Sequence, residues 1–142
     1  MTERVFLDAV GEDGRTGAVR IDFSTRPPYA LEVRRGTVES STTYEAKDLF
    51  AALIDLRLAL EAEGLLLCCQ GARGDVTSSG MERQAGGRHV FPFSPDTREI
   101  RRDSVDIFAP AAPDEVVTVE EQRRAIFALH GLPDPASGTF QK

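Results

Sequence analysis

The residues whose types could do chemistry gather in one segment, between positions 70 and 88. It reads QGARGDVTSSGMERQAGGR and contains five glycines. A polar loop punctuated by glycine is a common place for a binding site, and long loops in compact domains are often functional. The candidate binding residues in and beside this segment are Arg73, Asp75, Ser79, Met81, Arg83 and His89. Two interpretations stay open: the segment binds a ligand or partner, or its charges pair with one another and hold it to the fold.

Patterns typical of catalysis are missing from the sequence. Ser79 precedes His89 by ten residues, but the residues around Ser79 do not form the G-x-S-x-G nucleophile elbow. No G-x-x-x-x-G-K-[ST] phosphate loop occurs, and neither the two histidines nor the two cysteines have the spacing of a metal site. We therefore assign no catalytic residue and no metal ligand, expect no cofactor, and favour a protein that is not an enzyme.

An alternative function keeps the same segment as a small-ligand site or an active site. In that hypothesis Arg73 and Arg83 hold an anionic group, and Asp75 or His89 acts as acid or base. A pocket lined by Arg73, Asp75, Ser79 and His89 would favour it.

The position of Asp75 suggests a structural task as well. Aspartate stabilises turns by accepting hydrogen bonds from nearby groups. We expect the Asp75 carboxylate to bind loop amides or an arginine and so to order residues 71–81. On that expectation, replacing it by alanine destabilises the fold by about 1–3 kcal/mol.

The elements that position this segment begin with three strands. Residues 3–10, 19–24 and 29–34 each alternate apolar and polar side chains, clearest in Val19, Ile21 and Phe23. Their short connections predict an antiparallel meander.

A helix is predicted over residues 44–63. Thr42 and Glu45 have capping-box spacing, and Gly64 stands where a helix commonly ends. A stripe of four leucines packs on the sheet: Leu49, Leu53, Leu56 and Leu60. A second apolar strip, with Ile54 and Leu58, faces the other way, so either the C-terminal helix or a partner covers it.

The rest of the chain completes an α+β fold. The run at 65–69 predicts a central strand buried on both faces, and shorter strands follow at 89–93, with Pro92 at an edge or a strand end, and at 104–108. Thr118 and Glu121 form a second capping box, which starts a helix that ends near His130. We expect one domain over residues 1–133, an antiparallel sheet of about five to six strands with two helices packed on it, and a flexible tail at 134–142.

Composition and charge narrow the function classes. The chain has 142 residues, of which 41% are apolar and 28% charged, as in ordinary globular domains. It has no apolar run of the ~20 residues that a membrane span needs, and its N-terminus lacks a secretory signal. The net charge of −6 disfavours nucleic acid and suits a basic partner. Cys68 and Cys69 are adjacent, which predicts reduced thiols on opposite faces of a strand and a cytoplasmic protein.

Several motifs carry a resemblance to a family of small uncharacterised bacterial proteins. The loop motif is G-A-R-x-D-V-x-x-S-G-M-x-R-Q, which spans Gly71 to Gln84. It is preceded by D-L-F-x-A-L-x-x-L-R at 48–57 and followed by V-D-I-F at 105–108 and T-V-E-E-Q at 118–122. After the double glycine, Arg88 and His89 depart from the tyrosine-containing strand of the family pattern. The resemblance implies an immunity or accessory protein of the kind encoded beside toxins.

These observations lead to one expected function. We expect a small, acidic, cytoplasmic bacterial protein that binds another protein without catalysis, an immunity protein that neutralises a toxin domain being the specific case. The expected partner is a basic toxin domain or a second copy of the chain, and neither nucleic acid nor a membrane.

Overall fold

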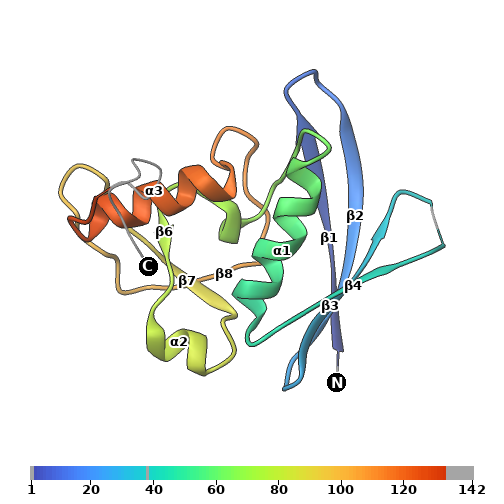
Figure 1. The fold of residues 1–142 in the computed structure, drawn as a ribbon, viewed down its shortest axis with the longest axis horizontal. Coiled ribbons are helices and arrows are strands. Elements are labelled where there is room, and N and C mark those ends of the chain that lie inside the picture. The colour runs from blue at the N-terminus through green and yellow to red at the C-terminus, as the bar shows by residue number, and fades with distance from the viewer. Residues whose placement is uncertain (1, 38, 134–142) are drawn as a thin grey trace.

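The computed structural model describes residues 2–37 and 39–133 and confirms the predicted α+β class (Figure 1). An antiparallel sheet of five strands has the order β4-β3-β2-β1-β5, and a smaller sheet has the order β6-β7-β8. The strands of the larger sheet are β1 (Thr2–Gly11), β2 (Thr16–Ser24), β3 (Tyr29–Arg35), β4 (Thr42–Ala46) and β5 (Leu65–Leu67). Those of the smaller sheet are β6 (Val76–Thr77), β7 (His89–Pro92) and β8 (Val105–Asp106). The helices are α1 (Leu49–Glu61), α2 (Gly80–Gln84) and α3 (Val119–Leu129), with a 3-10 turn, η1, at Gln70–Ala72. The predicted tail, 134–142, lies outside the described residues.

The predicted meander forms the larger sheet. Strands β1, β2 and β3 pair in sequence, and Val19, Ile21 and Phe23 all point into the core. The polar residues between them face outward, so one face of the sheet packs on α1 and the other meets solvent. Figure 1 shows α1 between the larger sheet and the elements that follow it in the chain. The alternation of apolar and polar side chains in the sequence therefore predicted which face of the sheet is buried.

The predicted start of the first helix is wrong. Residues 42–46, which include the supposed capping box of Thr42 and Glu45, form strand β4 at the end of the larger sheet. The helix begins at Leu49, and Asp48 caps it by accepting a hydrogen bond from the Ala51 amide at 2.8 Å. Pairing with β3 gives Thr42–Ala46 backbone bonds that helical geometry would break, so the tertiary context decides the boundary. The four-leucine stripe is fully buried, as predicted.

The predicted central strand at 65–69 is also placed differently. Only Leu65–Leu67 are a strand, and it pairs with β1 at the other end of the larger sheet. Cys68 and Cys69 follow it as free buried thiols, and Cys69 forms an isolated bridge with Pro110. Strand β5 has a neighbouring strand on one side only. Other chain segments cover the rest of the apolar run, which explains why it is continuous.

The segment at 70–88 is not one irregular loop. It contains η1, β6 and α2, and it joins the smaller sheet through β6 and β7. Pro92 is the last residue of β7, as its missing N–H allows. The second capping box is confirmed, because Thr118 and Glu121 exchange side-chain-to-backbone hydrogen bonds at the start of α3. The buried residues of both sheets and of α1 form one continuous hydrophobic cluster.

The double glycine after α2 lets this second part of the molecule approach α1. The Gly86 carbonyl accepts a hydrogen bond from the Leu49 amide at 2.7 Å. Gly87 has φ +73°, and a Cβ there would lie 2.7 Å from Asp48 Oδ1. A side chain at 87 would therefore meet both an unfavourable backbone conformation and the cap of α1.

We predict that Gly87→Ala lowers the free energy of unfolding by about 2–4 kcal/mol, because strain and steric overlap add. Gly14→Ala is the control: Gly14 has a similar φ of +87° but open space around the missing side chain. It should cost about 1 kcal/mol, the strain alone. Urea unfolding of both variants measures the difference, and equal losses would show that the approach to Asp48 is unimportant.

Candidate functional site

A buried cation on α1 organises the part of the chain that follows it. The Arg57 side chain is almost fully buried, with 1% of the residue exposed. Its guanidinium donates to Gln122 Oε1 at 2.6 Å, to the Val117 carbonyl at 2.9 Å and to the Gly71 carbonyl at 3.4 Å. Gln122 in turn donates from Nε2 to the carbonyls of Gly71 and Arg73, both at 2.9 Å. One arginine and one glutamine thereby join α1, η1 and α3.

Arg57 is held by neutral acceptors. Within residues 2–37 and 39–133, no carboxylate forms an ion pair with it. Burial lowers the pKa of its guanidinium, and the nearby Cys69 and Glu61 act in the opposite direction. A buried charge needs hydrogen-bond partners, so the carbonyls around it must stay in place.

Two further polar contacts join α1 to the later elements. At its start, Asp48 Oδ2 accepts from Arg83 Nε at 2.8 Å, and the Arg83 guanidinium lies 5.2 Å from the centre of the Phe50 ring. At its end, Glu61 Oε2 accepts from the Val119 amide at 2.9 Å. The helix is therefore fixed at its start, middle and end.

The structure divides the predicted loop residues among separate places. Arg73 and Asp75 form a bidentate pair, with N–O distances of 2.9 and 2.8 Å, and Arg73 also donates to Gln70. The expected arginine partner of Asp75 is thus present. Its carboxylate is 39% exposed, however, so the pair contributes little to stability. The cation that orders residues 71–73 is Arg57, which the sequence did not single out for this role.

The other loop candidates lie around α2. Ser79 caps this short helix by accepting from the Glu82 amide at 3.0 Å. His89 Nδ1 lies 3.7 Å from a carboxylate oxygen of Glu82, while Met81 points into solvent and is 83% exposed. Ser79 and His89 therefore each contact Glu82 in separate ways, and neither has the geometry of an oriented nucleophile and base.

The second apolar strip of α1 has a mixed environment. Ile54 is half-buried and lines a pocket beside Ile126 of α3, whereas Leu58 remains 49% exposed. The C-terminal helix thus covers one part of the strip and leaves the other open.

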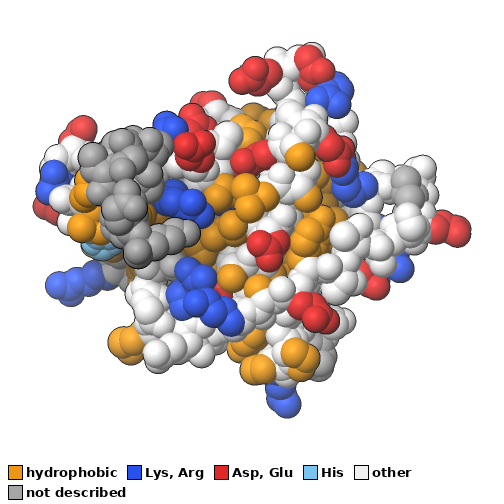
Figure 2. Space-filling view, viewed as in Figure 1, with side chains coloured by type: hydrophobic (Ala, Val, Ile, Leu, Met, Phe, Trp, Pro, Cys, Tyr) orange, Lys and Arg blue, Asp and Glu red, His pale blue; other side chains and the backbone are white. Residues whose placement is uncertain are grey.

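An acidic cleft lies at the end of the molecule that carries the β1–β2 turn. It has a volume of about 690 Å³ and lies between the β1–β2 turn, the end of α1 and the start of α3. Its apolar lining includes Val10, Leu65 and Leu66. Four carboxylates and one arginine also line it: Glu12, Asp13, Glu61, Glu121 and Arg15. Figure 2 shows acidic side chains along this end of the molecule, around the β1–β2 turn.

Three of these carboxylates already hold the walls of the cleft. Glu61 binds the start of α3, Glu121 completes the capping box, and Asp13 pairs with Arg15 at 2.8 Å. The hydrogen bonds to Arg15 and Thr118 lower the pKa values of Asp13 and Glu121, so both stay ionised near neutral pH. Glu12 forms no ion pair with any residue that the structure describes, and its carboxylate is exposed at the rim. The name acidic cleft refers below to this hollow with its four carboxylates, Glu12, Asp13, Glu61 and Glu121.

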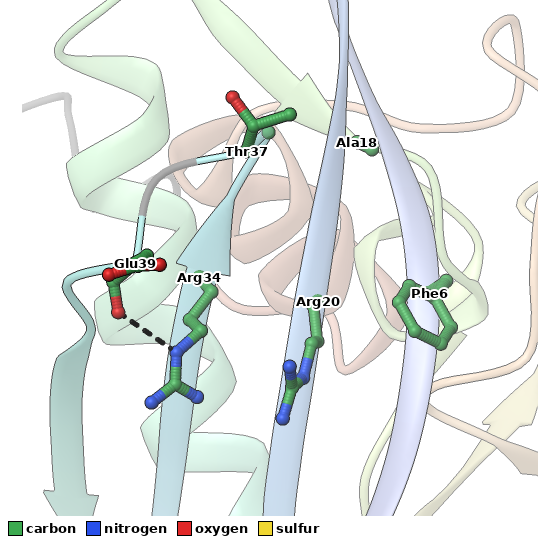
Figure 3. A pocket seen from close by; sticks show the side chains of 7 residues that line it. Phe6, Ala18, Arg20, Arg34, Thr37 and Glu39 are labelled. Atoms are coloured by element: carbon green, nitrogen blue, oxygen red, sulfur yellow. Dashed lines mark hydrogen bonds between the residues drawn. The ribbon is translucent and has the colours of Figure 1, made fainter.

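A second hollow lies on the open face of the larger sheet. Figure 3 shows Phe6, Arg20 and Arg34 side by side on three neighbouring strands. Phe6 is 67% exposed, and the Arg34 side chain donates to the Glu39 carbonyl at 3.2 Å. The two arginines are also paired with Asp22 and Glu32, so this face has little unpaired charge.

No protein-family model matches this chain, and no curated protein matches it. Within the described ranges, no three His, Cys, Asp or Glu side chains form a group that could hold a metal ion. No helix in the same ranges is long and apolar enough to cross a membrane.

Sequence reasoning missed most of the acidic cleft. The net charge alone does not say where in the fold the carboxylates gather. The carboxylates come from positions 12, 13, 61 and 121, which only the folded chain brings together. The single available signal was the excess of acidic over basic residues, 23 against 17.

We predict that Gln122→Leu lowers the free energy of unfolding by about 3 kcal/mol, because it removes one acceptor of the buried Arg57 and the amide that donates to the carbonyls of Gly71 and Arg73. Asp75→Ala provides the comparison and should cost less than about 1 kcal/mol, since it removes a partly exposed pair. Chemical unfolding of both variants gives the two values. A larger loss for Asp75→Ala would show that the loop, and not Arg57, holds this region.

We predict that the two cysteines react very slowly with iodoacetamide in the folded protein at pH 8. Burial raises the pKa of the Cys69 thiol to about 12, and burial with the nearby Asp8 raises that of Cys68. The reactive thiolate is therefore scarce as well as shielded. Mass spectrometry should find both thiols alkylated rapidly in denaturant, and rapid alkylation without denaturant would contradict the buried placement.

Proposed function

We propose that this chain is a non-enzymatic protein-binding module that captures a basic protein domain in its acidic cleft. The cleft itself is the observation that carries the proposal: four carboxylates beside an apolar lining, in a chain of net charge −6. The proposal places the protein in the cytoplasm of a bacterium, with a toxin domain as the specific partner and immunity as the biological role.

The chemistry of the cleft suits lysine and arginine side chains. Both have an apolar stem and a charged end, so the stem can pack on Val10 and Leu66 while the end reaches a carboxylate. A carboxylate offers about four acceptor positions, and the structural bonds of Glu61 and Glu121 use only some of them. The same carboxylates can therefore hold the cleft together and bind a cation.

The net charge supports the same partner. An acidic surface raises the rate at which a basic partner arrives and disfavours acidic competitors. Small acidic proteins can in this way capture basic enzymes tightly. A homodimer through the cleft is less favourable, because it would bring like charges together.

Placement of the loop residues gives no support to the enzyme alternative. Arg73 and Asp75 pair with each other near α3, while Arg83 pairs with Asp48 at the start of α1. His89 lies against Glu82 at a third place. The residues proposed to share one active site are therefore engaged in separate structural contacts.

We predict that Glu12→Lys weakens binding of the basic partner by about tenfold or more, because it places a like charge at the rim. Affinity capture from the source bacterium identifies basic candidates, and calorimetry with the purified partner gives Kd at low and high salt. Binding should weaken as salt rises.

Two variants serve as controls for this experiment. Glu45→Lys makes the same charge change on exposed strand β4 and should alter Kd less than about twofold. Phe6→Ala tests the open face of the sheet and should leave binding unchanged. Two results would refute the cleft as the interface. One is a loss of binding in either control variant together with unchanged binding by Glu12→Lys. The other is the capture of acidic proteins alone.

A further inference from the structure

A pocket between the three helices has the opposite electrostatic character. It has a volume of about 320 Å³ and lies where α1, α2 and α3 approach one another next to β6. No carboxylate is among its lining residues, although the chain has 23 acidic residues. Arginine side chains come to it from two elements, Arg83 from α2 and Arg123 from α3, and His130 at the C-terminal cap of α3 also lines it.

The two arginines differ in whether their guanidinium groups already have an acidic partner. Arg83 donates a hydrogen bond from Nε to the buried Asp48, and the Arg83 side chain is 29% exposed. Arg123 is exposed and makes no ion pair with residues 2–37 or 39–133. The terminal nitrogens of Arg83 and the whole Arg123 guanidinium are therefore free to bind an anion.

The remaining walls offer both hydroxyls and apolar surface. Thr77 and Ser78 lie on one side. Phe50, Ile54 and Ile126 form the apolar part, and the Arg83 guanidinium lies over the Phe50 ring. Gln122 closes the pocket, but its amide is fully engaged with Arg57 and two carbonyls, which fixes that wall.

We propose that this pocket binds a small organic anion, in which one carboxylate or phosphate group is attached to a compact apolar group. The head group contacts Arg123 and His130, with Arg83 beside them, and the apolar group packs on Phe50, Ile54 and Ile126. The volume is at the lower end for small-molecule sites, which selects a ligand about the size of one ring and its head group. This site is separate from the acidic cleft and does not depend on the proposed partner.

Binding can be measured by NMR on the full chain, following the methyl groups of Ile54 and Ile126. The probes are phenyl phosphate, benzoate, inorganic phosphate and the neutral benzyl alcohol. We expect phenyl phosphate or benzoate to bind at least about tenfold more tightly than inorganic phosphate or benzyl alcohol, because each control lacks one half of the ligand. The better of the two aromatic anions identifies the head group.

Arg123→Gln and Arg124→Gln are the matched variants. Arg124 is the next residue on α3, is paired with Glu120 and does not line the pocket. Both positions are exposed, so both variants should fold, and thermal unfolding checks this. Arg123→Gln should weaken anion binding about tenfold and Arg124→Gln less than twofold.

Three results would overturn the proposal. Equal binding of benzyl alcohol and phenyl phosphate would reveal a merely apolar hollow. Equal weakening by the two variants would reveal nonspecific attraction. Absence of methyl shifts at about 10 mM of either aromatic anion would show that the pocket does not bind this class of ligand.

Discussion

The positive charge of Arg57 inside the molecule constrains everything that packs after α1. An isolated buried cation is very unfavourable, so hydrogen bonds to acceptors must compensate its burial. Here the acceptors are two main-chain carbonyls and the amide oxygen of Gln122, which lies 65 residues further along the chain. Residues around 71 and 117 cannot move apart without breaking hydrogen bonds of that charge. The geometry of η1, of the segment before α3 and of α3 itself is thus fixed from one side chain.

The smaller sheet shows why such a connection is needed. Its strands have two to four residues, too few to be stable without neighbours. Asp48 at the start of α1 and Glu61 at its end bind the same half of the molecule that Arg57 binds. Through Glu61, this attachment also sets the width of the acidic cleft, and through Asp48 it holds Arg83 at the pocket between the helices. Both proposed sites therefore depend on polar residues of one mainly apolar helix.

Sequence patterns predicted the local features well. Alternation in Val19, Ile21 and Phe23 identified the buried face of the sheet, and Thr118 with Glu121 identified the start of α3, because both signals arise from neighbouring residues. The capping-box spacing of Thr42 and Glu45 is also a local signal, and here it gave a wrong prediction. Strand pairing with β3, a longer-range effect, outweighs it. The roles of Arg57 and Gln122 could not be predicted, since either residue type is ordinary on a helix surface. The pairing of Arg73 with Asp75 was predictable because only one residue separates them.

The two sheets and α1 share one continuous hydrophobic cluster, so we expect them to unfold together. Apolar residues of both sheets and of α1 belong to this one cluster. Amide protons in β7 and in the middle of α1 should consequently exchange with solvent through the same global opening, and at the same free energy. Slow exchange would then extend from the larger sheet into short strands whose own hydrogen bonds are too few to account for it. We therefore expect the molecule to unfold as one cooperative unit.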